Sequence, residues 1–131
     1  MAHRLRVKIY YEDTDAGGVV YYANYLRYLE RARTELLAEK GIIVSEYHDK
    51  GVYLVVYRVD IRYRRPARLG DVIQVETEVR EVKRASVELF HRVLRGDTLI
   101  AEADVTMACT DPTGRAARLP EAFSALGPAP A

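Results

Sequence analysis

A single long run of helical periodicity, set among segments of strand periodicity, limits how this chain can fold more than any other feature. Between residues 23 and 40 apolar side chains recur every three or four positions, which predicts one helix about 25 Å long. Asn24 is expected to cap its start, and Gly41 to supply the left-handed residue beyond its end. The broad apolar face predicts that other parts of the fold largely cover this helix. Its apolar positions are Tyr25, Leu29, Ala32 and Leu36, with Leu26 and Leu37 beside them.

Five other segments are predicted to be β-strands, because apolar and polar residues alternate or because Val and Tyr are abundant. They are residues 4–12, 52–64, 71–82, 85–95 and 98–110. In the first strand, one face is expected to carry Leu5, Val7, Ile9 and Tyr11. Gly96-Asp97 is typical of a hairpin turn. Residues 45–51 are expected to form one or two helical turns with Ser45 as the cap.

The order of these elements predicts the fold class. One strand and one long helix are followed by four strands joined by short turns, and short turns imply antiparallel pairing. A single sheet with one apolar helix on its face gives a two-layer α+β fold.

Composition restricts the class of protein further. The 131 residues fit one domain, 1–131, with a core at about 4–120 and a partly disordered tail at 121–131. A net charge of +1 does not favour nucleic acid or an anionic membrane as partner, and no apolar run is long enough to span a bilayer. Cys109 is the one cysteine, which excludes a disulfide within the chain and predicts a core thiol in a reducing, cytoplasmic location.

The stretch "YYEDTDAGGVVYYANY" places three carboxylates, Glu12, Asp13 and Asp15, within four residues, directly before Gly17 and Gly18. A calcium loop is not supported, because two of the required ligand positions hold Gly17 and Asn24. Neither phosphate-loop nor dinucleotide spacing is present. The three histidines, His3, His48 and His91, are scattered, so no metal site is expected, and His91 is interpreted as structural or surface-exposed.

Two interpretations of the acidic stretch remain on chemical grounds. Asp and Gly are common in turns, so a polar connection between strand and helix is one. The other is a catalytic carboxylate, because the following "VVYYANY" could form an apolar wall that disfavours the charged form. The glycines would allow close approach of a ligand, and the helix start would offer free N–H groups to a developing oxyanion.

The segment from Asp13 to Tyr25 fits the pattern D-x-D-x-x-G-x-V-[YF]-x-x-x-Y. It resembles the signature of the 4-hydroxybenzoyl-CoA thioesterase-like hotdog family, and in particular the short-chain acyl-CoA thioesterases encoded with bacterial Tol–Pal systems. "YRVDIRYRRPARLGD" at 57–71 and the strand order are also similar. The resemblance covers about residues 4–120. It implies a hotdog fold, in which an antiparallel sheet of about five strands wraps one long central helix, and a homodimer or dimer of dimers with active sites at the interface.

The resemblance also implies roles for individual residues. Asp15 would be the general base or nucleophile, with backbone N–H groups at the helix start as the oxyanion hole. Tyr22 would lie near the substrate, at a position that is histidine in many Tol–Pal relatives and tyrosine in the 4-hydroxybenzoyl-CoA enzymes. Asp13, Gly17 and Gly18 would support the site. The expected CoA-phosphate ligands are Lys83 and Arg84, serving the site across the interface, and Arg65 from a second cluster with Arg64 and Arg68.

The expected function is hydrolysis of a short-chain or aromatic acyl-CoA to free acid and CoA, with no cofactor other than the CoA of the substrate. The alternative is a non-catalytic acyl-CoA-binding or envelope-partner module on the same fold. A hotdog hydratase is less favoured, because the loop region has no Asp–His pair. An acyl-carrier-protein substrate stays open, although the lack of a large basic face favours CoA.

Overall fold

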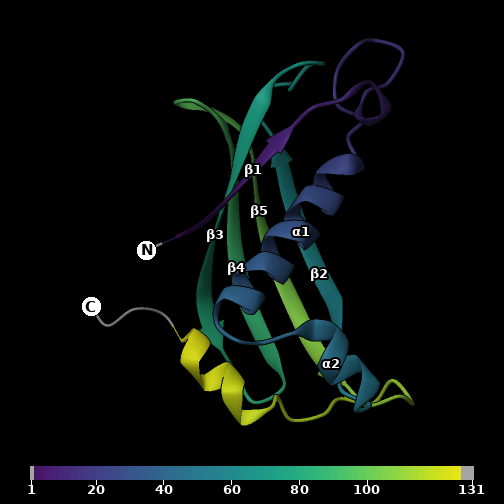
Figure 1. Ribbon diagram of the computed structural model, residues 1–131, viewed down its shortest axis with the longest axis vertical. Coiled ribbons are helices and arrows are strands. Elements are labelled where there is room, and N and C mark those ends of the chain that lie inside the picture. Colours follow the sequence, from purple (N-terminus) through teal and green to yellow (C-terminus); the bar gives the residue numbers. More distant parts are fainter. Residues whose placement is uncertain (1, 128–131) are drawn as a thin grey trace.

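The computed structural model describes residues 2–127. Five strands, two α-helices and two short 3₁₀ helices follow one another along this part of the chain (Figure 1). They are β1 (His3–Lys8), η1 (Tyr11–Asp13), α1 (Asn24–Glu39), α2 (Val44–Asp49), β2 (Tyr53–Tyr63), β3 (Val72–Val82), β4 (Ser86–Arg95), β5 (Thr98–Thr110) and η2 (Glu121–Leu126).

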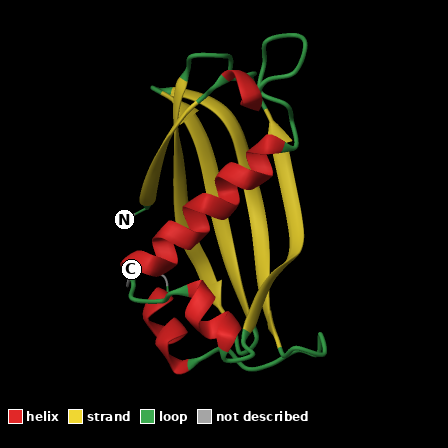
Figure 2. Ribbon diagram, turned by 45° about the vertical axis from the view of Figure 1, so that its right-hand side comes forward, coloured by secondary structure: helices red, strands yellow, loops and turns green. Residues whose placement is uncertain are grey.

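The five strands form one sheet in the order β1-β3-β4-β5-β2, and every neighbouring pair is antiparallel. Helix α1 lies across one face of this sheet, and the long strands curve past it (Figure 2). The predicted α+β class, strand number and antiparallel pairing are therefore confirmed. Strands β1 and β2 are the two edges.

Local details differ from the sequence prediction at three places. Strand β1 ends at Lys8, because η1 begins three residues later and leaves Tyr11 exposed instead of on the buried face. The residue before α1 is Ala23, and the Asn24 side chain donates to the Asp13 carbonyl instead of capping the helix. Helix α2 begins at Val44, so Ser45 is inside it and is not its cap. The prediction for Gly41 is confirmed by its φ of 79°.

The buried face of α1 packs on apolar side chains of the sheet, and the core has two clusters. The first contains Tyr25, Tyr28, Leu29 and Ala32 of the helix with Ile73, Val75 and Val105 of the sheet. The second, nearer the end of α1, contains Leu36 and Leu37 with Val87, Leu89, Met107 and Cys109. Cys109 is buried, which confirms its interpretation as a core thiol, and burial raises the pKa of this thiol.

A small buried polar group, formed by Arg33, Thr77 and His91, lies between α1 and the sheet. Thr77 and His91 are partners in the β3–β4 register, and the Thr77 hydroxyl lies 2.9 Å from His91 Nδ1. The Arg33 guanidinium is 3.4 Å from His91 Nε2. Burial, followed by the charge of Arg33, lowers the pKa of His91 to about 3, so this imidazole is neutral and accepts from Arg33. His91 is therefore a structural residue, as predicted.

The region after β5 adds to the second cluster. Residues 121–126, predicted to belong to a partly disordered tail, form η2, and Phe123 and Leu126 are buried. Because two apolar side chains of this turn cover the sheet, the core extends beyond residue 120. Residues 128–131, the rest of the predicted tail, lie outside the described residues.

Candidate active site

Asp13 holds the acidic loop together through both its side chain and its backbone. Its Oδ2 accepts from the Tyr10 N–H at 2.8 Å. Its carbonyl accepts from the Tyr21 N–H at 2.9 Å and from Asn24 Nδ2 at 3.1 Å. Beside it the Tyr28 hydroxyl is buried without a hydrogen bond among the described residues, and burial together with the Asp13 carboxylate raises the pKa of Tyr28. This arrangement suits the supporting role predicted for Asp13.

Asp15 lies in a tight turn that its own backbone closes. The Asp15 N–H donates to the Val19 carbonyl at 2.9 Å, and the Gly18 N–H donates to the Asp15 carbonyl at 3.0 Å. The Gly17 N–H donates to Asp15 Oδ1 at 2.8 Å. Gly18 has a φ of 77°, which a side chain would disfavour, and a Cβ on Gly17 would lie only 3.2 Å from Asp15 Oδ1. Both glycines therefore fix the direction of the Asp15 carboxylate.

The apolar wall expected around this carboxylate is not formed by residues 2–127 of the chain. Asp15 is exposed, and so are the Tyr21 and Tyr22 side chains that follow it. The loop lies at one end of the sheet (Figure 1), where residues 67–69 bind its backbone through the Ala67 carbonyl and the Leu69 N–H but leave these side chains exposed.

The start of α1 offers free backbone donors, as predicted. The N–H groups of Asn24 and Leu26 donate to the carbonyls of Tyr21 and Ala23, at 2.8 and 3.2 Å. Within residues 2–127, the N–H groups of Tyr22, Ala23 and Tyr25 have no acceptor. Unsatisfied N–H groups at a helix start favour an anion or a developing oxyanion.

A small hollow of about 270 Å³ lies next to these donors, between the helix start and the end of β2. Its residues are Val20, Tyr22, Tyr25, Tyr63, Arg64, Arg65 and Pro66. The rings of Tyr25 and Tyr63 meet edge to face, with centroids 5.4 Å apart. The Ala67 N–H donates to the Tyr25 hydroxyl at 3.2 Å, and the Tyr63 hydroxyl donates to the Tyr22 carbonyl at 2.9 Å. Sequence reasoning did not identify Tyr63, because the strand alone does not show which loop its end approaches.

A sequence profile for the thioesterase-like superfamily matches residues 10–126, which include the acidic loop, α1 and the strands β2 to β5. The chain belongs to this superfamily. The resemblance seen in the sequence is thereby confirmed, and so is the hotdog fold that it implied.

Named relatives agree with this assignment. The chain is 43% identical over 106 residues to the acyl-CoA thioesterase YbgC of Haemophilus influenzae, covering 80% of this chain and 78% of that protein. It is 40% identical over 110 residues to the acyl-CoA thioester hydrolase YbgC of Escherichia coli O6:H1, covering 83% and 82%. The crystal structure of a hypothetical protein, TT1821 from Thermus thermophilus, has a TM-score of 0.88 and 34% identity, covering 95% of this chain and 98% of that one.

The predicted CoA ligands of this thioesterase-like domain lie in two separate places. Arg65 lines the hollow beside the helix start, together with Arg64, which pairs with Glu102 at 2.7 Å. Arg68 is nearby, and its N–H donates to Asp71. The cluster predicted at 64–68 is therefore at the same end of the sheet as the acidic loop.

Lys83 and Arg84 are at the opposite end of the sheet. Strand β3 begins at Val72, opposite Lys8 of β1, and runs for 11 residues away from the acidic loop. At ~3.3 Å per residue, the turn after it is about 35 Å from the start of the strand. Within a single chain, these two residues cannot serve the same bound molecule as Asp15 unless that molecule spans the sheet.

A hollow of about 920 Å³ lies beside Lys83 and Arg84, and Arg118 also lines it. The Leu119 N–H donates to the Arg84 carbonyl at 2.8 Å, so the segment after β5 is bound to the β3–β4 turn. Lys83 Nζ pairs with Glu88 at 3.1 Å, and this carboxylate raises the pKa of Lys83. Sequence reasoning missed Arg118, since its only sequence signal was a positive charge after a turn.

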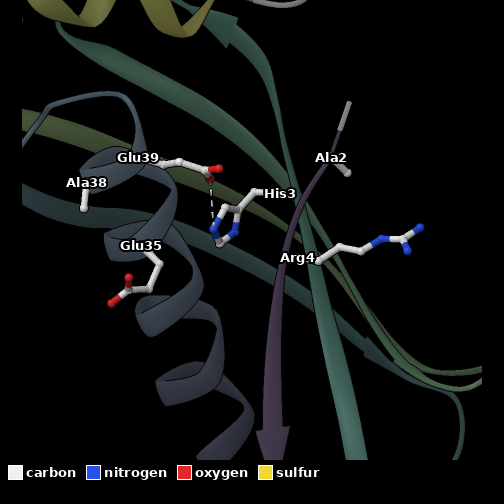
Figure 3. Close-up of a pocket in the computed structure, with 6 residues that line it drawn as sticks. All are labelled: Ala2, His3, Arg4, Glu35, Ala38 and Glu39. Carbon is white, nitrogen blue, oxygen red and sulfur yellow. Dashed lines mark ion pairs between the residues drawn. The ribbon is translucent and has the colours of Figure 1, made fainter.

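A third hollow, of about 820 Å³, lies between the start of β1 and the end of α1 (Figure 3). Here His3 Nε2 is 3.3 Å from Glu39, and His3 Nδ1 is buried without a partner among the described residues. Arg4 points away to the other side of the strand, where it pairs with Glu76. The acidic loop contributes no residue to this hollow, so it is not part of the candidate site.

The remaining histidine, His48, does not belong to a metal centre formed by the described residues. His48 of α2 stacks on Tyr53, with ring centroids 4.4 Å apart. Within residues 2–127, no group of three or more His, Cys, Asp or Glu side chains is arranged to hold a metal ion. No helix in the same range is both long enough and apolar enough to cross a membrane.

Proposed function

We propose that this protein hydrolyses an acyl-CoA thioester, with Asp15 as the catalytic carboxylate. The observation that carries the proposal is the geometry of the acidic loop. Asp15 is held by the Gly17 N–H in a turn that leads directly to free N–H groups at the start of α1. A carboxylate beside preorganised donors is the pairing that acyl transfer requires. The names of the two YbgC relatives support the same reaction class.

The chemistry follows from these groups. As a general base, Asp15 removes a proton from water, the hydroxide adds to the thioester carbonyl, and the C–S bond breaks to give the acid and CoA thiolate. As a nucleophile, Asp15 forms an anhydride with the acyl group and water cleaves it. In both schemes the oxyanion is stabilised by N–H groups at the helix start, and no cofactor beyond the substrate's CoA takes part. Tyr22, which lines the adjacent hollow, would contact the acyl group.

The second part of the proposal is a homodimer that completes the site. Strand β2 is an edge strand in which Val55, Val56, Tyr57 and Val59 are between 37% and 75% exposed. An exposed apolar edge of this length favours pairing with another strand. Antiparallel pairing of β2 with β2 of a second copy would bring opposite ends of the two sheets together. The partner copy would then supply the basic turn after β3 to the end that carries the acidic loop.

Within one chain, the turn that carries Lys83 and Arg84 is about 35 Å from the end of the sheet that holds Asp15. In this dimer, Lys83 and Arg84 of one copy would bind the phosphates of a CoA whose thioester lies at Asp15 of the other copy. The dimer would also cover the exposed Tyr21 and Tyr22 and create the apolar surroundings that one protomer lacks. The buried free thiol of Cys109 suits the reducing cytoplasm, which we include in the proposal.

The test is release of CoA thiol from acetyl to palmitoyl, benzoyl and 4-hydroxybenzoyl-CoA by wild type and Asp15→Asn. The asparagine carbonyl can still accept from the Gly17 N–H, so the turn is preserved while the base is lost. We expect kcat to fall at least ~10²-fold. Glu12→Gln, an exposed carboxylate in the same loop, is the matched control and should keep wild-type turnover.

The outcomes separate catalysis from binding. Normal turnover by Asp15→Asn would exclude Asp15 as the catalytic group. If wild type released no thiol from any substrate while acyl-CoA still raised its melting temperature, the protein would instead be a binding module.

A further inference from the structure

One hydrogen bond joins the end of β2 to the segment just before α1. Tyr63, the last residue of β2, donates from its hydroxyl to the Tyr22 carbonyl at 2.9 Å. These residues are 41 positions apart in the sequence, so the contact exists only because the fold brings the strand end to the helix start. Its significance rests on the function proposed above, because Tyr22 and Ala23 carry two of the free N–H groups.

The bond constrains the peptide unit between Tyr22 and Ala23. The Tyr22 carbonyl and the Ala23 N–H belong to the same planar trans peptide, so fixing the direction of the oxygen fixes the N–H in the opposite direction. Tyr22 itself is otherwise weakly held, since its side chain is 63% exposed and its N–H has no acceptor within residues 2–127. The Asn24 N–H to Tyr21 carbonyl bond closes the turn around this peptide, and the Tyr63 hydroxyl is the one described hydrogen bond made to the peptide itself.

Tyr63 is well placed to act as a rigid support. Its backbone lies opposite Ala101 in the β2–β5 register. Its ring packs edge to face against Tyr25 and Tyr22, with centroid distances of 5.4 and 6.4 Å. Burial, followed by the neighbouring hydroxyls of Tyr25 and Tyr22, raises the pKa of Tyr63, so its oxygen keeps the proton that it donates.

Accepting a hydrogen bond at the carbonyl also changes the N–H on the other side of the peptide. Hydrogen bonds in a chain polarise one another, so a donor on the Tyr22 oxygen makes the Ala23 N–H a stronger donor. A preorganised donor requires no reorganisation when charge develops on the substrate. Both effects act on the transition state more than on ground-state binding.

We infer that Tyr63 is a positioning residue for the oxyanion hole, which orients the Tyr22–Ala23 backbone through its hydroxyl. It does not contact the reacting atoms and transfers no proton. The role predicts that loss of this one hydroxyl lowers kcat and leaves KM nearly unchanged.

The test compares Tyr63→Phe with wild type on the best substrate from the panel above. The ring packing is retained and only the hydrogen bond is lost. We expect kcat to fall about tenfold, less than the ~10²–10³-fold typical of removing an oxyanion donor itself, with KM within about twofold. Tyr53→Phe is the control: it is at the other end of the same strand, and its hydroxyl has no hydrogen bond within residues 2–127.

A second readout does not depend on activity. The amide ¹⁵N resonance of Ala23 should shift in Tyr63→Phe, because the carbonyl of the same peptide has lost its donor, and should stay in place in Tyr53→Phe. Unchanged kcat and an unchanged Ala23 resonance would overturn the inference while leaving the proposed function intact. Equal changes of kcat and melting temperature in both variants would show a merely structural effect and overturn it too. A wild type without thioesterase activity would overturn both proposals.

Discussion

The buried group around His91 makes a quantitative prediction about acid stability. His91 is fully buried, with Arg33 of α1 on one ring nitrogen and Thr77 of β3 on the other. Its pKa is lowered from 6.5 to about 3 in the folded protein, first by burial and then by the Arg33 charge. In the unfolded chain the imidazole returns to its ordinary pKa. Below pH 6.5 the unfolded state therefore binds the extra proton, and acid favours unfolding.

The magnitude follows from these two pKa values. Stability contributed by neutral His91 is present above pH 6.5 and is lost as pH falls from 6.5 towards 3, at up to ~1.4 kcal/mol per pH unit. Between pH 7 and pH 5 the loss is about 2 kcal/mol. This value depends almost entirely on the unfolded pKa, because at pH 5 the folded imidazole is still neutral.

The variant that isolates this effect is His91→Gln. A glutamine side chain is neutral at every pH, its carbonyl can accept from Arg33, and its amide can donate to the Thr77 hydroxyl. Urea unfolding of wild type and variant would be measured at pH 7 and pH 5, at one fixed protein concentration, because association also changes apparent stability. Wild type should lose about 2 kcal/mol more than the variant over this interval.

Taking the difference between the two proteins removes every contribution to the pH dependence that is common to both. Equal losses in wild type and variant would refute the reasoning, since they would mean that His91 binds no extra proton on unfolding. A larger loss in the variant would have the wrong sign and would refute it as well.

Two further predictions concern the proposed dimer and its ligand. Replacing Lys83 and Arg84 together by alanine should raise KM for acyl-CoA about tenfold or more with kcat little changed, because phosphate contacts lie far from the thioester. Lys40→Ala is the control. An unchanged KM in the double variant would show that Lys83 and Arg84 are not part of the site. Val59→Glu should place a charge on the exposed β2 edge and convert the dimer to a monomer with lower turnover. Light scattering would measure the oligomeric state, and thiol release would measure turnover. A variant that stayed dimeric would show that the interface lies elsewhere.

Local sequence patterns determined much of the fold. The period of three to four residues in 23–40 became α1 at Asn24–Glu39, and the five strand segments became the five strands. Gly41 took its predicted left-handed conformation, since only glycine adopts it without steric cost. These features follow from neighbours along the chain, so sequence suffices to predict them.

The sequence also showed the residue types and the spacing of the acidic motif. The spacing of Asp13, Asp15, Gly17 and Gly18 predicted a carboxylate in a tight turn before a helix, and that turn is present. The catalytic roles themselves stay predictions. The sequence did not predict the observed use of the Asn24 side chain, whose Nδ2 donates to the Asp13 carbonyl while its oxygen caps no N–H of α1, because the position of Asp13 beside the helix start depends on the tertiary fold.

Contacts between residues far apart in sequence depended on the tertiary fold. The Tyr63–Tyr22 bond, the Arg33–His91 pair and the Arg84–Leu119 contact join positions that no period or motif relates. The separation of Lys83 and Arg84 from Asp15 by the length of β3 likewise depends on strand direction and register. Sequence patterns specified which helices and strands form, because these depend on composition and on the local period of apolar residues. Where the elements meet depends on how one helix and five strands share a core, and this packing placed the groups of the candidate site.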